Sequence, residues 1–124
     1  MINKPVAKAL QAEIGATHDE LFTGSKTGTS DTFKSINGML WSLLLDVESQ
    51  EMQAEHARQK LADALATENS NIDKGRAPDG RWVSQHATGY AEHCTNIARV
   101  ASKVRLIMHL RTVWLSSHPD AGQP

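Results

Sequence analysis

The chain has few of the residues that build cross-linked or metal-centred folds. Only one of its 124 residues is cysteine, which excludes a disulfide framework and a multi-thiolate metal site within one chain. Glycine and proline number 8 and 4, too few for a collagen-like or low-complexity protein. Aromatic residues make up 5%, so we expect an aliphatic, alanine-rich core. The length fits one compact domain.

Long hydrophobic runs are also missing. The longest apolar stretch covers residues 39–45 and is broken by Ser42, whereas a bilayer-spanning helix needs about 20 apolar residues. The N-terminus has no apolar segment of the kind found in secretory signals. We therefore expect a soluble protein that works in the cytoplasm.

The net charge of −1 conceals an asymmetry between the two parts of the chain. Residues 1–73 contain six basic and eleven acidic residues, a net charge of −5. Residues 74–124 contain seven basic and three acidic residues, a net charge of +4. Such a division fits either a nucleic-acid-binding face or two segments that attract each other.

The first 30 residues predict one short helix and a loop. Pro5 suits the first position of a helix over residues 5–14, and Gly15 suits its end. Residues 15–30 are expected to form a loop, because residues 23–30 are almost entirely glycine, serine and threonine. This segment is not a phosphate-binding P-loop, since the order of its Gly, Lys and Ser or Thr residues is wrong and no strand precedes it.

Two long amphipathic helices follow, over residues 31–68 and 82–117. Ser30 or Asp31 can cap the first, and the connector 69–81 contains the turn-forming sequence Pro78-Asp79-Gly80. Residues 118–124 form a polar tail. Apolar residues recur at spacings of mostly three and four in both helices, and only Arg111 interrupts the second stripe. The pattern predicts an all-α single domain over residues 1–124, a small bundle built on a long antiparallel hairpin with a short N-terminal helix.

A short connector sets a register for this hairpin. If Ile72 lies opposite Val83, then Leu40 faces Leu115. The same register predicts charge pairs across the hairpin, with Glu55 near Arg99 and Glu51 near Lys103 or Arg105. Apolar and charged positions thus favour one alignment of the two helices.

No arrangement of residues indicates catalysis or metal binding. His86 and His93 share a helix face but lie two turns apart, about 10.5 Å along the axis, which is too far for one mononuclear site. We interpret both as polar-face residues, and Cys94 as a small packed residue on the apolar stripe. A Glu-x-x-His pair of the di-iron bundle type is absent. We expect no enzymatic activity, no metal and no cofactor.

Basic residues and exposed apolar residues are the candidate binding groups. Dispersed cations suit contact with phosphate groups, but those on the last helix can equally neutralise the acidic residues of the helix opposite. The candidate nucleic-acid contacts are Lys74, Arg76, Arg81, Arg99, Lys103 and Arg105.

A hairpin and one short helix cannot cover all of the apolar surface of residues 39–45 and of the last helix. Apolar patches that stay exposed are typical of sites that bind a partner. Trp41 and Trp114 are expected in the core region, while Trp82 either anchors its helix or contacts a partner. The candidate partner contacts are Trp82, Leu106, Leu110 and Trp114.

The paired helices and the basic set resemble the small helical subunits of CRISPR ribonucleoprotein effector complexes in size and layout, over about two-thirds of the chain. That resemblance implies a non-catalytic subunit that holds nucleic-acid backbone through scattered lysines and arginines. The predicted function is such a subunit of a multi-protein, nucleoprotein assembly, with RNA or DNA left open. The alternative is a protein-only interaction or self-association module, such as a phage or plasmid accessory factor.

Overall fold

The computed structural model describes residues 2–77 and 80–119, and within them it contains four α-helices. Helix α1 (Pro5–Ile14) begins with proline and ends at Gly15, whose positive φ of 78° glycine adopts without strain. The backbone N–H groups of Asn3 and Lys4 donate to the carboxylate of Glu48, at 3.0 and 2.9 Å. A side chain from a later helix therefore binds the two residues that precede α1.

The predicted loop at residues 15–30 is wrong, because its centre forms helix α2 (His18–Lys26). The Thr17 hydroxyl caps this helix by accepting from the Glu20 N–H at 3.1 Å. Two acidic residues in the first turn and a lysine in the last turn interact favourably with the helix dipole. Leu21 is fully buried, so tertiary packing stabilises a segment whose composition is typical of loops.

Two long helices make up most of the chain, as the sequence predicted. Helix α3 (Asp31–Asp73) extends five residues beyond its expected end, and α4 (Gly80–Ser117) starts two residues early. The Ser30 hydroxyl caps α3 through the Phe33 N–H at 3.2 Å, as expected. Past the end of α3, Gly75 adopts a φ of 77° and donates to the Ile72 carbonyl. Pro78, Asp79 and residues 120–124 of the expected turn and tail lie outside the described residues.

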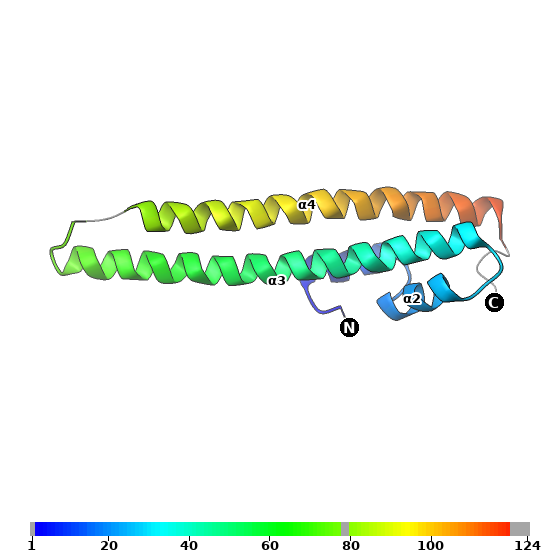
Figure 1. Cartoon of the computed structure of the whole chain (residues 1–124), viewed down its shortest axis with the longest axis horizontal. Helices are drawn as coiled ribbons and strands as arrows, with labels where there is room; N and C mark the ends of the chain where they lie inside the picture. The colour runs from blue at the N-terminus through cyan, green and yellow to red at the C-terminus, as the bar shows by residue number, and fades with distance from the viewer. Residues whose placement is uncertain (1, 78–79, 120–124) are drawn as a thin grey trace. The chain divides into compact units, whose positions relative to one another are not determined.

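The chain divides into two compact units, and both long helices run through both of them. The four-helix unit consists of residues 1–49 and 98–124, and the hairpin unit consists of residues 50–97. Within each unit α3 and α4 lie antiparallel and side by side (Figure 1). The all-α fold class and the long antiparallel hairpin are confirmed.

The four-helix unit holds the hydrophobic core, to which all four helices contribute. Its central residues are almost completely inaccessible to solvent: Leu10, Leu21, Leu40, Leu44, Val47 and Val104. Trp41 packs against this core and stacks on His18, with ring centroids 5.6 Å apart. Helices α1 and α2 therefore bury the side of α3 and α4 that they contact.

The hairpin unit has only two buried apolar residues among those the structure describes, Ala54 and Ala64. Its larger apolar side chains remain accessible, with Met52 at 55% and Leu65 at 46% of their surface exposed. Figure 1 shows that α3 extends past the first turn of α4 in this unit. The apolar side chains that two helices bury fully here are therefore small ones.

The predicted register of the hairpin is wrong by two to three helical turns. It would place His118 opposite Asn37, whereas the guanidinium of Arg111 donates to the Asn37 side chain at 2.9 Å. In the hairpin unit, His93 lies against Gln50 at 3.4 Å. An apolar pattern that repeats every seven residues looks the same after a shift of seven, so the pattern alone could not distinguish these alignments.

Candidate functional site

An open groove of about 720 Å³ lies between α3 and α4 in the four-helix unit. Small residues of α3 leave room for it, and the larger apolar side chains of both helices line it. The lining residues are Ser35, Gly38, Met39, Ser42, Leu43, Lys103, Leu106 and Ile107. No helix among the described residues covers this groove, which agrees with the surplus apolar face expected from the sequence.

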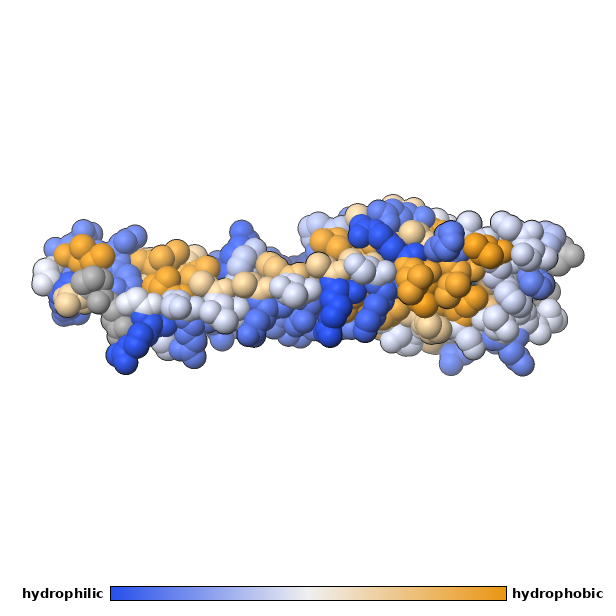
Figure 2. All heavy atoms as spheres, turned by 90° about the horizontal axis from the view of Figure 1, so that it is seen from above, coloured by the Kyte–Doolittle hydropathy of each residue, from blue (hydrophilic) through white to orange (hydrophobic). Residues whose placement is uncertain are grey.

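Exposed apolar side chains continue along α4 beyond the groove. Leu106, Leu110 and Val113 follow one another at spacings of four and three, which places them on one helix face. They expose 62%, 48% and 49% of their surface. Figure 2 shows hydrophobic residues gathered over this half of α4. The expected partner contacts Leu106 and Leu110 are therefore accessible.

The two tryptophans proposed as partner contacts differ in their surroundings. Trp82 is 55% exposed in the first turn of α4, and its ring meets the edge of His86 at 4.5 Å between centroids. Trp114 is half-buried and stacks on His118 at 3.8 Å. Its indole N–H has no hydrogen-bond partner within residues 2–77 and 80–119. Trp82 belongs to the hairpin unit and Trp114 to the four-helix unit, so the two rings do not form one surface within a unit.

The candidate basic residues are divided between the two units. Arg99, Lys103 and Arg105 belong to the four-helix unit. Arg105 lies 3.4 Å from the carboxylate of Glu13 in α1, a pair that the hairpin register did not predict. Lys103 lines the groove. Arg105 thus forms an ion pair within the fold, and Lys103 lies beside apolar surface.

The other three basic residues belong to the hairpin unit. Lys74 and Arg76 are exposed at the turn that follows α3, and Arg81 is exposed in the first turn of α4. The Arg76 guanidinium donates to the Asn71 side chain at 3.3 Å. These side chains face solvent, as a phosphate contact requires.

Sequence reasoning missed a polar contact inside the four-helix unit. Asn37 is buried, accepts from Arg111, and donates through its side-chain amide to the Gly24 carbonyl at 3.3 Å. The Arg111 guanidinium also lies over the Phe33 ring at 5.3 Å, and burial lowers the pKa of Arg111 below its ordinary value. The signal in the sequence was Arg111 itself, a charged residue on an apolar stripe.

The interpretation of Cys94 as a packed residue is wrong, because its side chain is exposed. Cys94 beside Tyr90 raises the pKa of the Tyr90 hydroxyl above its ordinary value of 10.0, while the charge of Arg58 acts in the opposite direction. His86 and His93 are partly exposed. In the described part of the chain, no cluster of three or more His, Cys, Asp or Glu residues could hold a metal ion.

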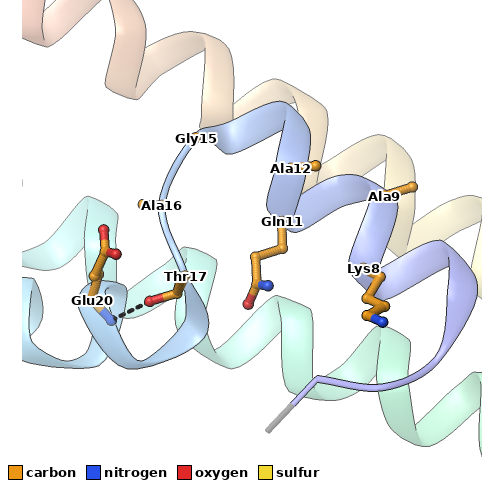
Figure 3. Close-up of a pocket in the computed structure, with 8 residues that line it drawn as sticks. All are labelled: Lys8, Ala9, Gln11, Ala12, Gly15, Ala16, Thr17 and Glu20. Atoms are coloured by element: carbon orange, nitrogen blue, oxygen red, sulfur yellow. Dashed lines mark hydrogen bonds between the residues drawn. The ribbon is translucent and has the colours of Figure 1, made fainter.

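A second depression, of about 530 Å³, lies where α1 turns into α2 (Figure 3). Small residues form much of its wall, with the charged side chains of Lys8 and Glu20 at its edges. The Gln11 side chain accepts from the His18 backbone N–H at 2.7 Å, and Thr17 caps α2. Its polar groups thus serve the turn between the two helices, so the groove between α3 and α4 is the better candidate site.

None of the helices in the described residues combines the length and the apolar character needed to cross a membrane. A search with the sequence and the structure finds no matching protein-family model, no matching curated protein and no matching solved structure. The groove and the charged residues of this chain are therefore the features that bear on its function.

Proposed function

We propose that the chain is a non-catalytic helical interaction module that binds another protein through the groove between α3 and α4. The observation that carries the proposal is the open apolar surface of Met39, Leu106 and Leu110, each between 47% and 62% exposed in the one unit that has a core. Contiguous apolar patches of this kind mark interaction sites. Helices α1 and α2 cover one side of the long helices, and the partner covers the other.

A photo-crosslinking experiment tests this proposal. Benzoylphenylalanine replaces Leu110 in one variant and Leu65 in a matched control, because these leucines are 48% and 46% exposed in different units. We expect a discrete crosslinked protein in cells of the native host from the Leu110 position only. Leu106→Asp in the same chain should abolish that product while circular dichroism stays unchanged. Equal crosslinking from both positions, or none from Leu110, contradicts the proposal.

Nucleic-acid binding is a second proposed function, and it draws on the exposed Lys74 and Arg76 beside the Gly75 turn. Together with Arg81 they form a basic group to which a phosphate backbone can bind without base readout. The resemblance to small helical subunits of CRISPR ribonucleoprotein effector complexes rests on the paired long helices and on a basic set that includes these three residues. If the chain has this second function, the partner protein belongs to a nucleoprotein assembly.

A salt titration of RNA and DNA binding tests this second function. The triple change of Lys74, Arg76 and Arg81 to alanine should weaken binding to any base sequence. It should also flatten the salt dependence by roughly one unit of logarithmic slope for each lost phosphate contact. Lys60→Ala, an exposed change on α3, serves as the control. An unchanged slope in the triple variant excludes this basic group as the phosphate-binding surface.

A further inference from the structure

We infer that the occupant of the groove is a single amphipathic α-helix of another protein, with acidic side chains along the edge that faces α4. This inference rests on the proposed function, since it names the partner of the same groove. Three features of the groove indicate this partner: its length, the charges on its two walls and the small area that it offers.

The dimensions of the groove suit one helix. Its α3 wall runs from Ser35 to Leu43, which is about 12 Å, or slightly more than two helical turns. The small side chains of Ser35 and Ser42 leave this wall open, and the exposed side chains of Met39 and Leu106 line the groove beside them. Helices that dock in such grooves insert apolar anchors spaced three, four and seven residues apart. The exposed residues Leu110 and Val113 extend the same surface for a further turn of contact.

The wall contributed by α4 carries positive charge only. Residues 98–117 contain four basic residues and no aspartate or glutamate. Arg105 and Arg111 interact with Glu13 and Asn37 inside the four-helix unit. Lys103 lines the groove, and it makes no ion pair or hydrogen bond with the residues that the structure describes. A carboxylate on the partner helix can therefore pair with Lys103.

The wall contributed by α3 has a different charge. Ser35 and Ser42 are neutral, and the exposed Asp46 lies one turn beyond Ser42 on the same face. An acidic residue of the partner is thus favoured on the α4 side and disfavoured on the α3 side. This difference fixes how the bound helix is rotated about its axis, because its acidic edge turns toward Lys103.

A second copy of this chain is a poorer occupant. The groove and the exposed residues beside it on α4 offer fewer contacts than the roughly 20–30 residues that each side of a stable dimer uses. The α4 walls of two copies also carry charges of the same sign, so they repel each other when they meet. A short helical segment needs only the area that the groove offers.

Two synthetic peptides of about 15 residues, roughly four helical turns, test the inference. Both carry leucines at alternating spacings of three and four, and the flanking edge positions are Glu in one and Lys in the other. Fluorescence anisotropy with the full chain should show the acidic peptide binding roughly three- to tenfold more tightly at low salt, with the difference shrinking as salt is added. Lys103→Glu should remove or reverse that preference, and Lys60→Glu in the hairpin unit should leave it unchanged.

Each alternative outcome overturns the inference in a recognisable way. Equal binding of the two peptides, binding of neither, or a preference that survives Lys103→Glu excludes an acidic helix as the partner. A dimer in sedimentation experiments that Leu106→Asp disrupts identifies a second copy as the occupant. The proposed interaction function is judged separately, by crosslinking from the Leu110 position, so it can hold when the acidic helix fails.

Discussion

The four-helix unit and the hairpin unit share the same two helices, α3 and α4, but they bury very different amounts of apolar surface. In the first, Leu40, Leu44 and Val104 are completely inaccessible to solvent. In the second, the buried apolar residues among those described are Ala54 and Ala64, and Leu65 remains 46% exposed. The difference is due to α1 and α2, which belong to the first unit and contribute Leu10 and Leu21 to its core.

This contrast shows what a helical hairpin can stabilise by itself. Two helices contact each other along one stripe, so a large side chain on that stripe keeps part of its surface in water. Additional helices are needed to surround a leucine completely. The core of this protein therefore depends on two short N-terminal helices of 10 and 9 residues rather than on the long helices alone.

The largest expected effect comes from removing a core leucine. Leu44→Ala should lower the free energy of unfolding by about 2–5 kcal/mol, because Leu44 is fully buried and the change leaves a cavity. Leu65→Ala in the hairpin unit should cost less than about 1 kcal/mol. Urea unfolding followed by circular dichroism measures both. Similar losses at the two sites would contradict the assignment of the core to the four-helix unit.

A smaller effect is expected from the buried polar contact. Asn37→Ala removes the acceptor of Arg111 and the donor to the Gly24 carbonyl, so it should cost about 1–3 kcal/mol. Asn71→Ala is the matched control, because Asn71 also accepts from an arginine but is only partly buried, in the hairpin unit. Its cost should stay within about 0.5 kcal/mol. The same urea titration compares them, and equal costs would exclude a structural role for the buried contact.

Two glycines within helices should respond in opposite directions to alanine. Gly89→Ala in the hairpin unit should stabilise the protein by about 0.5–1 kcal/mol, since nothing lies within 4 Å of the new methyl group. Gly24→Ala should destabilise it, because the methyl group would lie 2.7 Å from the Asn37 amide nitrogen. Melting temperatures of the two variants provide the measurement. A gain in stability from Gly24→Ala would show that Asn37 moves without cost.

The smallest expected effect is a shift in the titration of Tyr90, the only tyrosine in the chain. Cys94→Ala should lower the pKa of Tyr90 toward 10.0, and Arg58→Ala should raise it further. Absorbance at alkaline pH reports the phenolate. Because the raised pKa means that the folded chain holds this proton more tightly, its contribution to stability is lost as pH rises above the ordinary tyrosine range. An unchanged titration in Cys94→Ala would exclude the contact between the two side chains.

Local patterns predicted the helical elements well where a long periodic stripe was present. The apolar spacings indicated both long helices, and Pro5, Gly15 and Ser30 marked helix ends that the structure confirms. Helix α2 was missed because a nine-residue segment with glycine, serine and threonine has little helical tendency of its own. Tertiary packing stabilises this helix, because Leu21 packs in the core and the Phe22 ring packs against Trp41.

The candidate site was predicted in part. The surplus apolar face, with Leu106 and Leu110, could be read from residue spacing, since the number of helices available to cover it was small. The position of Lys103 in the groove could not be predicted from the sequence. A lysine beside the apolar stripe of a helix is equally consistent with an ion pair across the hairpin. Its surroundings became clear only from the arrangement of both helices.

The sequence by itself determined the all-α class, the two long helices and their antiparallel pairing, because these depend on periodicity and on the short connector. Only the tertiary structure decided the register, the pairing of Arg105 with Glu13 and the face that remains open. A stripe that repeats every seven residues is unchanged by a shift of seven, so many alignments satisfy it equally. Packing of α1 and α2 and the contact between Asn37 and Arg111 distinguish one of them.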